Sequence, residues 1–137
     1  MRGAPMTAAR AVKRTESGEQ KLLFEWAALA ERGHPELKLL HAIPNGGWRH
    51  AKTAAGLKAE GVKAGVPDLC LPVPRGGYHG LYIELKSAKG RLGKRQKEWL
   101  EMLGRNGYLA VACYGFEDAR GLILSYLHGS MSPWQTA

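Results

Sequence analysis

The sequence predicts a single α/β domain in which a small mixed sheet carries a helix on either side. Short runs of alternating apolar residues, typical of half-buried strands, take turns with segments whose apolar residues recur every three or four positions, as in helices. The chain has 137 residues, 45% of them hydrophobic, which fits one domain with its own core. Glycine and proline cluster between these segments, where turns are expected.

The first half of the chain predicts two helices and one strand. A capping box at 17–20 (Ser-Gly-Glu-Gln) begins a helix over 17–32, which ends before Gly33 and Pro35. A strand is expected at about 38–43 and a short helix at about 51–60.

The second half predicts two neighbouring strands near 68–73 and 81–86, then a helix over 93–105, a strand over 108–114 and a helix over 116–127. Alternation of Leu109, Val111 and Cys113 supports the last strand. Residues 1–15 contain basic residues and no acid, which predicts a flexible basic arm before a domain at 16–128. Residues 129–137 are expected to form a loose tail.

Two carboxylates and a lysine are predicted to meet on one face of the strand pair. Asp68 opens the first strand, while Glu84 and Lys86 point to the same side of the second, because strand side chains alternate with a period of two. Turn-forming residues separate the strands: Pro72, Pro74, Gly76, Gly77 and Gly80. Asp68 and Glu84 then lie across a hairpin, although a slip of one residue in the register would separate them.

This cluster has the chemistry of a site for a hydrolytic metal ion. Two carboxylates with few other ligands suit Mg²⁺ or Mn²⁺, which keep several waters and take further oxygens from phosphate. Such an ion activates water and stabilises charge on a phosphodiester. Lys86 would orient or deprotonate that water, or offset the developing negative charge. The arrangement is that of a nuclease centre in outline.

The charge balance points to a nucleic-acid partner. Twenty Lys and Arg against 12 Asp and Glu give a formal net charge of +8 and a pI near 9.7. Six basic residues and no acid lie between 86 and 97, and a second basic group follows the Asn-Gly-Gly loop at 45–47. We expect nucleic-acid contacts from Asn45, Arg49, Lys52, Arg75, Lys89, Arg91, Lys94 and Arg95.

These residues resemble the VRR-NUC branch of the PD-(D/E)xK nuclease superfamily, in particular its small stand-alone phage-type members. The resemblance covers roughly 16–127 and is carried by Pro67-Asp68, Glu84-x-Lys86, the Ile-Pro-Asn-Gly-Gly loop at 43–47 and the glycines that frame Asp68. It implies a restriction-endonuclease-like core and metal-dependent, structure-selective cleavage of branched DNA. Relatives include Holliday-junction resolvases.

The resemblance assigns roles to three further groups. It implies that Glu19 is an outer metal or water ligand, that Gln96 binds water or braces Lys86, and that the main-chain carbonyl of Leu85 completes the metal shell. For Glu19 the alternative is an acid favoured by the dipole at the first turn of its helix. For Gln96 it is an amide satisfied at a helix start.

The partners and the reaction remain expectations. Two strands of a Holliday junction need two active sites, which predicts a homodimer. No run approaches the roughly 18 apolar residues of a membrane span, so a cytoplasmic protein is expected, in the host cell if phage-encoded. Cys70 and Cys113 are expected to be buried thiols.

The alternatives to a structure-selective DNA nuclease are a nicking or general nuclease guided by a DNA-targeting partner, a nuclease acting on RNA, and a DNA-binding protein without catalysis.

Overall fold

The computed structural model describes residues 14–44 and 53–131. Its elements are, in chain order, α2 (Glu16–Ala30), the 3₁₀ helix η1 (Pro35–Leu39), β1 (His41–Ala42), α3 (Ala54–Ala59), β2 (Leu69–Leu71), β3 (Leu81–Lys86), α4 (Lys94–Arg105), β4 (Leu109–Tyr114) and α5 (Phe116–Leu127). None of the helices in these two segments is long and apolar enough to cross a membrane.

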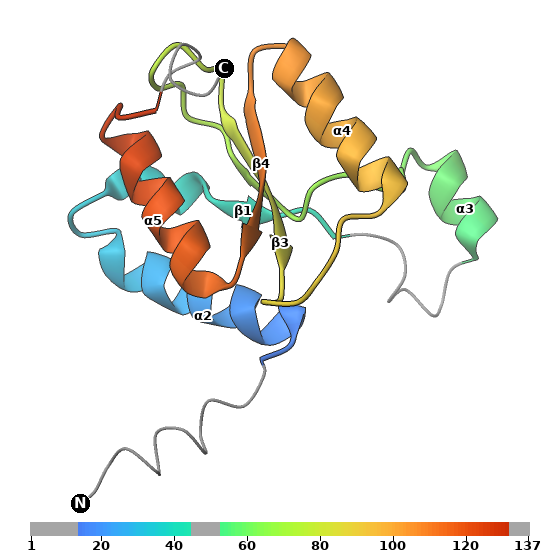
Figure 1. Ribbon diagram of the computed structural model, residues 1–137, viewed down its shortest axis with the longest axis horizontal. Coiled ribbons are helices and arrows are strands. Elements are labelled where there is room, and N and C mark those ends of the chain that lie inside the picture. Colours follow the sequence, from blue (N-terminus) through green and yellow to red (C-terminus); the bar gives the residue numbers. More distant parts are fainter. Residues whose placement is uncertain (1–13, 45–52, 132–137) are drawn as a thin grey trace, which may run out of the picture.

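The strands form a four-stranded mixed sheet in the order β1-β2-β3-β4. β1, β2 and β3 are antiparallel neighbours, whereas β3 and β4 are parallel and are joined through α4. Helices α2 and α5 cover one face of the sheet, α4 covers the other, and α3 lies beyond α4 (Figure 1). The predicted α/β fold with helices on both sides of a small mixed sheet is confirmed.

The core lies between the sheet and the pair α2–α5. Its buried residues include Leu23, Ala27, Leu81, Ile83, Leu85, Ala119, Ile123 and Tyr126. The odd-numbered residues of β3 face this core, as the alternation predicted. The Tyr126 hydroxyl donates to the carbonyl of Val73 at 2.6 Å, so this buried polar group has a partner.

The first helix starts earlier than predicted. Thr15 is its N-cap, and the Thr15 hydroxyl accepts a hydrogen bond from the N–H of Gly18 at 2.9 Å. The capping box proposed at 17–20 is therefore wrong, because those residues already lie inside the helix. Arg14 and Thr15 belong to the folded part, while the rest of the predicted arm and residues 132–137 of the tail lie outside the described residues.

Only two residues of the strand predicted at 38–43 form a strand, and the segment before them is a 3₁₀ helix that ends at Leu39. Pro35 occupies its first turn, and its backbone bonds span three residues, from the Leu37 N–H to the His34 carbonyl and from the Leu40 N–H to the Leu37 carbonyl. Leu37 and Leu40 are buried three positions apart, which is a helical spacing rather than a strand alternation. Only His41–Ala42 remain as strand.

Candidate active site

Asp68 and Glu84 face each other across β2 and β3. The strands pair Leu69 with Ile83, so one further step along the antiparallel register brings Asp68 opposite Glu84. Asp68 Oδ2 also accepts a hydrogen bond from the N–H of Leu85 at 2.9 Å. The structure therefore brings together the two carboxylates that the sequence predicts as a pair.

Pro67 removes the hydrogen bond that the Leu85 carbonyl would ordinarily accept across these strands. A further step along the same register places Pro67 opposite Leu85, at a position where two strand residues normally exchange hydrogen bonds. Proline has no N–H that could donate to the Leu85 carbonyl, and the Leu85 N–H donates to the side chain of Asp68 instead. The carbonyl predicted to complete a metal shell thus receives no hydrogen bond from Pro67.

Glu84 is buried and only half satisfied. The residue is 2% exposed, and its Oε2 accepts a hydrogen bond from Gln96 Nε2 at 3.0 Å and lies 3.6 Å from Lys86 Nζ. Its Oε1 is buried without a hydrogen-bond partner. Burial, and after it the neighbouring Asp68, raises the pKa of Glu84 to about 8, partly offset by Lys86. A cation bound here would stabilise the charged form of Glu84 against both its burial and its repulsion by Asp68.

Lys86 sits between two carboxylates, and one of them is not among the residues predicted from sequence. Its Nζ lies 3.7 Å from Glu16 Oε2 as well as 3.6 Å from Glu84 Oε2, and the lysine is 7% exposed. Glu16 is the first residue of α2, where an exposed acid is ordinarily explained by the helix dipole alone. No local pattern connects it with a lysine 70 positions later, so only the fold reveals this contact.

Gln96 reaches Glu84 rather than Lys86. Its Nε2 donates to Glu84 Oε2, and its Oε1 accepts from the N–H of Gly93 at 2.7 Å, at the start of α4. The amide is therefore satisfied at a helix start, as the alternative interpretation has it, and it also orients a carboxylate of the site. In this structure the group that it braces is Glu84.

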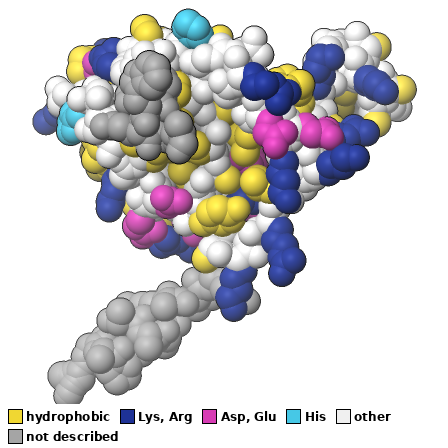
Figure 2. All heavy atoms as spheres, turned by 45° about the horizontal axis from the view of Figure 1, so that its top comes forward, with side chains coloured by type: hydrophobic (Ala, Val, Ile, Leu, Met, Phe, Trp, Pro, Cys, Tyr) yellow, Lys and Arg dark blue, Asp and Glu magenta, His cyan; other side chains and the backbone are white. Residues whose placement is uncertain are grey.

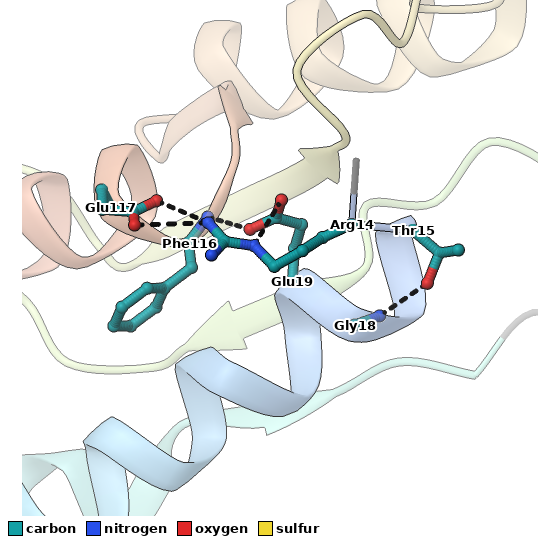
Figure 3. A network of polar contacts seen from close by, with 6 residues as sticks. All are labelled: Arg14, Thr15, Gly18, Glu19, Phe116 and Glu117. Carbon is teal, nitrogen blue, oxygen red and sulfur yellow. Dashed lines mark hydrogen bonds and ion pairs between the residues drawn. The ribbon is translucent and has the colours of Figure 1, made fainter. Parts of the chain in front are cut away.

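Glu19 has other partners than the predicted metal. Its Oε1 accepts from the N–H of Phe116 at 2.7 Å, and its Oε2 accepts from Arg14 Nε at 3.1 Å (Figure 3). The metal-ligand role stays a prediction. Glu19 lies in the first turn of α2, and its contact with Phe116 holds it at the start of a second helix, α5.

The loop before Asp68 is packed tightly against α4. Gly65 has φ +92°, and a Cβ atom there would lie 2.8 Å from backbone and side-chain atoms of Arg95. A side chain at this position is excluded both by conformation and by space. The loop that leads into Asp68 and the helix that carries Gln96 are thus in direct backbone contact.

The predicted nucleic-acid contacts fall into three groups. Lys89, Arg91, Lys94 and Arg95 are exposed on the loop after β3 and the first turn of α4. Lys and Arg side chains gather on the α3–α4 side of the face in Figure 2. Arg75 pairs with Glu36 at 2.5 Å and donates to the Leu127 carbonyl, and its contact with nucleic acid stays a prediction. Asn45, Arg49 and Lys52 lie outside the described residues.

The oxygens at this site fit a hard divalent cation. Asp68, Glu84 and the Leu85 carbonyl offer oxygen only, and the orphaned Oε1 of Glu84 is a ligand atom without another partner. Within the described ranges no group of three or more His, Cys, Asp or Glu side chains could hold a metal. Water and substrate oxygens would complete the shell, as Mg²⁺ prefers. The two cysteines are buried free thiols, as predicted.

The fold defines a class of protein: a restriction-endonuclease-like α/β domain of nuclease type. The family model described as the VRR-NUC domain matches residues 7–117. The chain belongs to the VRR-NUC family. It is similar to a solved structure titled "VRR_NUC domain protein", with 34% sequence identity and a TM-score of 0.74 over 85% of this chain and 91% of the other. A search of curated proteins found no match.

Proposed function

We propose that this VRR-NUC domain is a Mg²⁺- or Mn²⁺-dependent endonuclease that hydrolyses phosphodiester bonds in branched DNA. The observation that carries the proposal is the buried Glu84, whose Oε1 has no partner although Asp68 and Lys86 lie beside it. A carboxylate in this state is costly for the fold unless a cation binds it.

Asp68, Glu84 and the Leu85 carbonyl would hold the cation. When bound, it would lower the pKa of a water and stabilise negative charge on the phosphodiester. Gln96 keeps Oε2 of Glu84 in place through its amide, and the Leu85 N–H does the same for Asp68 Oδ2. Both hydrogen bonds orient the carboxylates before substrate arrives.

Lys86 would act on the attacking water or on the charged phosphate. Its Nζ is held near Glu84 and Glu16, which fixes the end of a long side chain that otherwise has many rotamers. From there it would orient or deprotonate water, or offset negative charge in the transition state. Glu16 is 48% exposed and offers a second acceptor beside Lys86 Nζ.

The exposed basic residues on the loop after β3 and on α4 would hold the DNA backbone. They lie on the segments that leave Lys86 and carry Gln96, so phosphates bound there would come close to the carboxylates. Phosphate contacts carry no sequence information, so recognition by DNA shape is expected. A homodimer would supply two sites for a symmetric junction.

Cleavage of labelled four-way junction, flap and matched linear duplex tests the proposal. Wild type, Asp68→Ala and a surface-acid control, Glu101→Ala on α4, are compared in Mg²⁺, in Mn²⁺ and in EDTA. We expect the wild type and the control to cut the branched substrates only with metal, and Asp68→Ala to be inactive. Equal cutting of linear duplex would favour a general nuclease, and binding without cutting in every metal would favour a DNA-binding protein.

A further inference from the structure

A second buried carboxylate, Glu19, joins two helices near the site. The residue is 4% exposed and both of its oxygens are engaged, Oε1 by the Phe116 N–H and Oε2 by Arg14 Nε. Figure 3 shows its side chain reaching from α2 to the start of α5, with Arg14 bridging Glu19 and Glu117. Unlike Glu84, this carboxylate is fully satisfied by the protein.

Glu19 supplies a cap that α5 lacks in its own sequence. Phe116 is the first residue of α5, and the N-cap before it is Gly115, which has no side chain to accept a hydrogen bond. The first N–H groups of a helix need acceptors and form its positive end, where a carboxylate is stabilised. Gly115 has φ +100°, a conformation that favours glycine, and a Cβ there would make only an ordinary van der Waals contact of 3.7 Å with Glu19 Oε1.

The same turn also holds the end of β3. The N–H of Gly115 donates to the Lys86 carbonyl at 2.9 Å, and the next N–H, that of Phe116, donates to Glu19. One turn before Glu19 on α2, Glu16 reaches Lys86 Nζ at 3.7 Å. Glu19 is therefore connected with Lys86 in two ways. The neighbouring amides of Gly115 and Phe116 link it to the main chain of Lys86, and the first turn of α2, through Glu16, links it to the ammonium.

We infer that Glu19 is a positioning residue for Lys86. Glu19 holds α2 against the start of α5, and this keeps the Lys86 ammonium between Glu16 and Glu84. The inference rests on the role proposed above for Lys86, and it gives Glu19 a function other than binding metal. Arg14 offsets the buried charge but is 42% exposed and shared with Glu117, so its removal should matter less than that of Glu19.

Steady-state cleavage by the full chain tests this role. We compare wild type, Glu19→Ala, Glu19→Gln and the exposed control Glu25→Ala on the same helix. Glu19→Ala should lower kcat by about tenfold or more, since small displacements of a catalytic group are that costly. KM for DNA and the Mg²⁺ concentration for half-maximal rate should stay within about twofold. Glu19→Gln should recover most of kcat, because its Oε1 still accepts from Phe116.

Two results would overturn the inference. A rise of about tenfold or more in the half-maximal Mg²⁺ concentration, in both Glu19 variants, would make Glu19 a metal ligand. A kcat of wild-type size in Glu19→Ala would show that Lys86 does not need this contact.

Hydrogen exchange of the Phe116 amide in EDTA gives a readout that does not depend on cleavage. The amide should exchange faster in Glu19→Ala than in wild type or Glu19→Gln, and equal rates in all three would refute the cap. A wild type that cuts no substrate in either metal would instead defeat the proposed nuclease function itself. The two failures are therefore distinguishable.

Discussion

Strand β3 separates two regions that differ in whether their buried polar groups have hydrogen-bond partners. On the side of α2 and α5, the buried hydroxyl of Tyr126 donates to Val73 and the neighbouring side chains are apolar. On the side of α4, Glu84 is equally buried but keeps one oxygen without a partner beside a second carboxylate. The buried polar group on the side of α2 and α5 has its partner within the protein, whereas the carboxylate on the side of α4 leaves one oxygen free for the proposed cation. The unsatisfied atom, rather than burial itself, separates site from core.

The largest effect should follow a change on the α4 side that leaves the fold intact. Glu84→Gln should lower metal-dependent cleavage by about a thousandfold, because it removes a charged ligand. Its stability at pH 7 in EDTA should equal or exceed that of wild type, since a folded-state carboxyl with a pKa near 8 is mostly neutral, like glutamine, whereas the unfolded wild-type chain gains stability by releasing that proton. Cleavage rates and urea unfolding measure the two quantities. A variant destabilised by several kcal/mol would contradict the comparison.

A cavity in the core, on the side of the sheet that α2 and α5 cover, should instead lower the stability of the fold. Leu23→Ala empties a fully buried position on α2 and should lower the free energy of unfolding by about 3 kcal/mol. Leu29→Ala is the matched control, since Leu29 is 79% exposed on the same helix and its loss should cost less than about 0.5 kcal/mol. Urea unfolding measures both. Similar losses for the two variants would mean that α2 does not pack as described.

A smaller effect should come from the satisfied polar group of the core. Tyr126→Phe leaves the Val73 carbonyl buried without its donor and should cost about 1 to 2 kcal/mol of stability. Cleavage per folded molecule should be unchanged, because the hydroxyl lies on the core side of β3. Thermal unfolding and initial cleavage rates check this prediction, and a loss of rate without a loss of stability would count against it.

The most gradual effect should appear in the pH dependence of stability without metal. Glu84 has a pKa near 8 in the folded protein against 4.5 as its ordinary value, so the folded state keeps a proton that the unfolded chain has released. Stability should therefore fall as pH rises from about 4.5 to 8, by less than about 1.4 kcal/mol per pH unit, and then level off. Urea unfolding in EDTA should show this slope in wild type relative to Glu84→Gln. Parallel curves would contradict the raised pKa.

Sequence reasoning performed well where the pattern is local. The period of two in a strand places Glu84 and Lys86 on one face, and the framing prolines and glycines place Asp68 opposite. It failed where distant residues decide. Glu16 looks like an ordinary first-turn acid until the fold brings it to Lys86, and no local pattern predicts that Arg75 pairs with Glu36. The 3₁₀ turn after Pro35 was missed because its leucines also fit a strand.

Gly65 has a consequence for how mutations in this chain should be interpreted. It has no side chain and no chemistry, yet its positive φ and its contact with Arg95 leave no room for any other amino acid. A survey of substitutions along the chain would therefore find Gly65 as intolerant as the carboxylate of Asp68. Intolerance there reports the fit between a loop and a helix, so sensitivity to mutation alone cannot separate the residues that react from those that leave space.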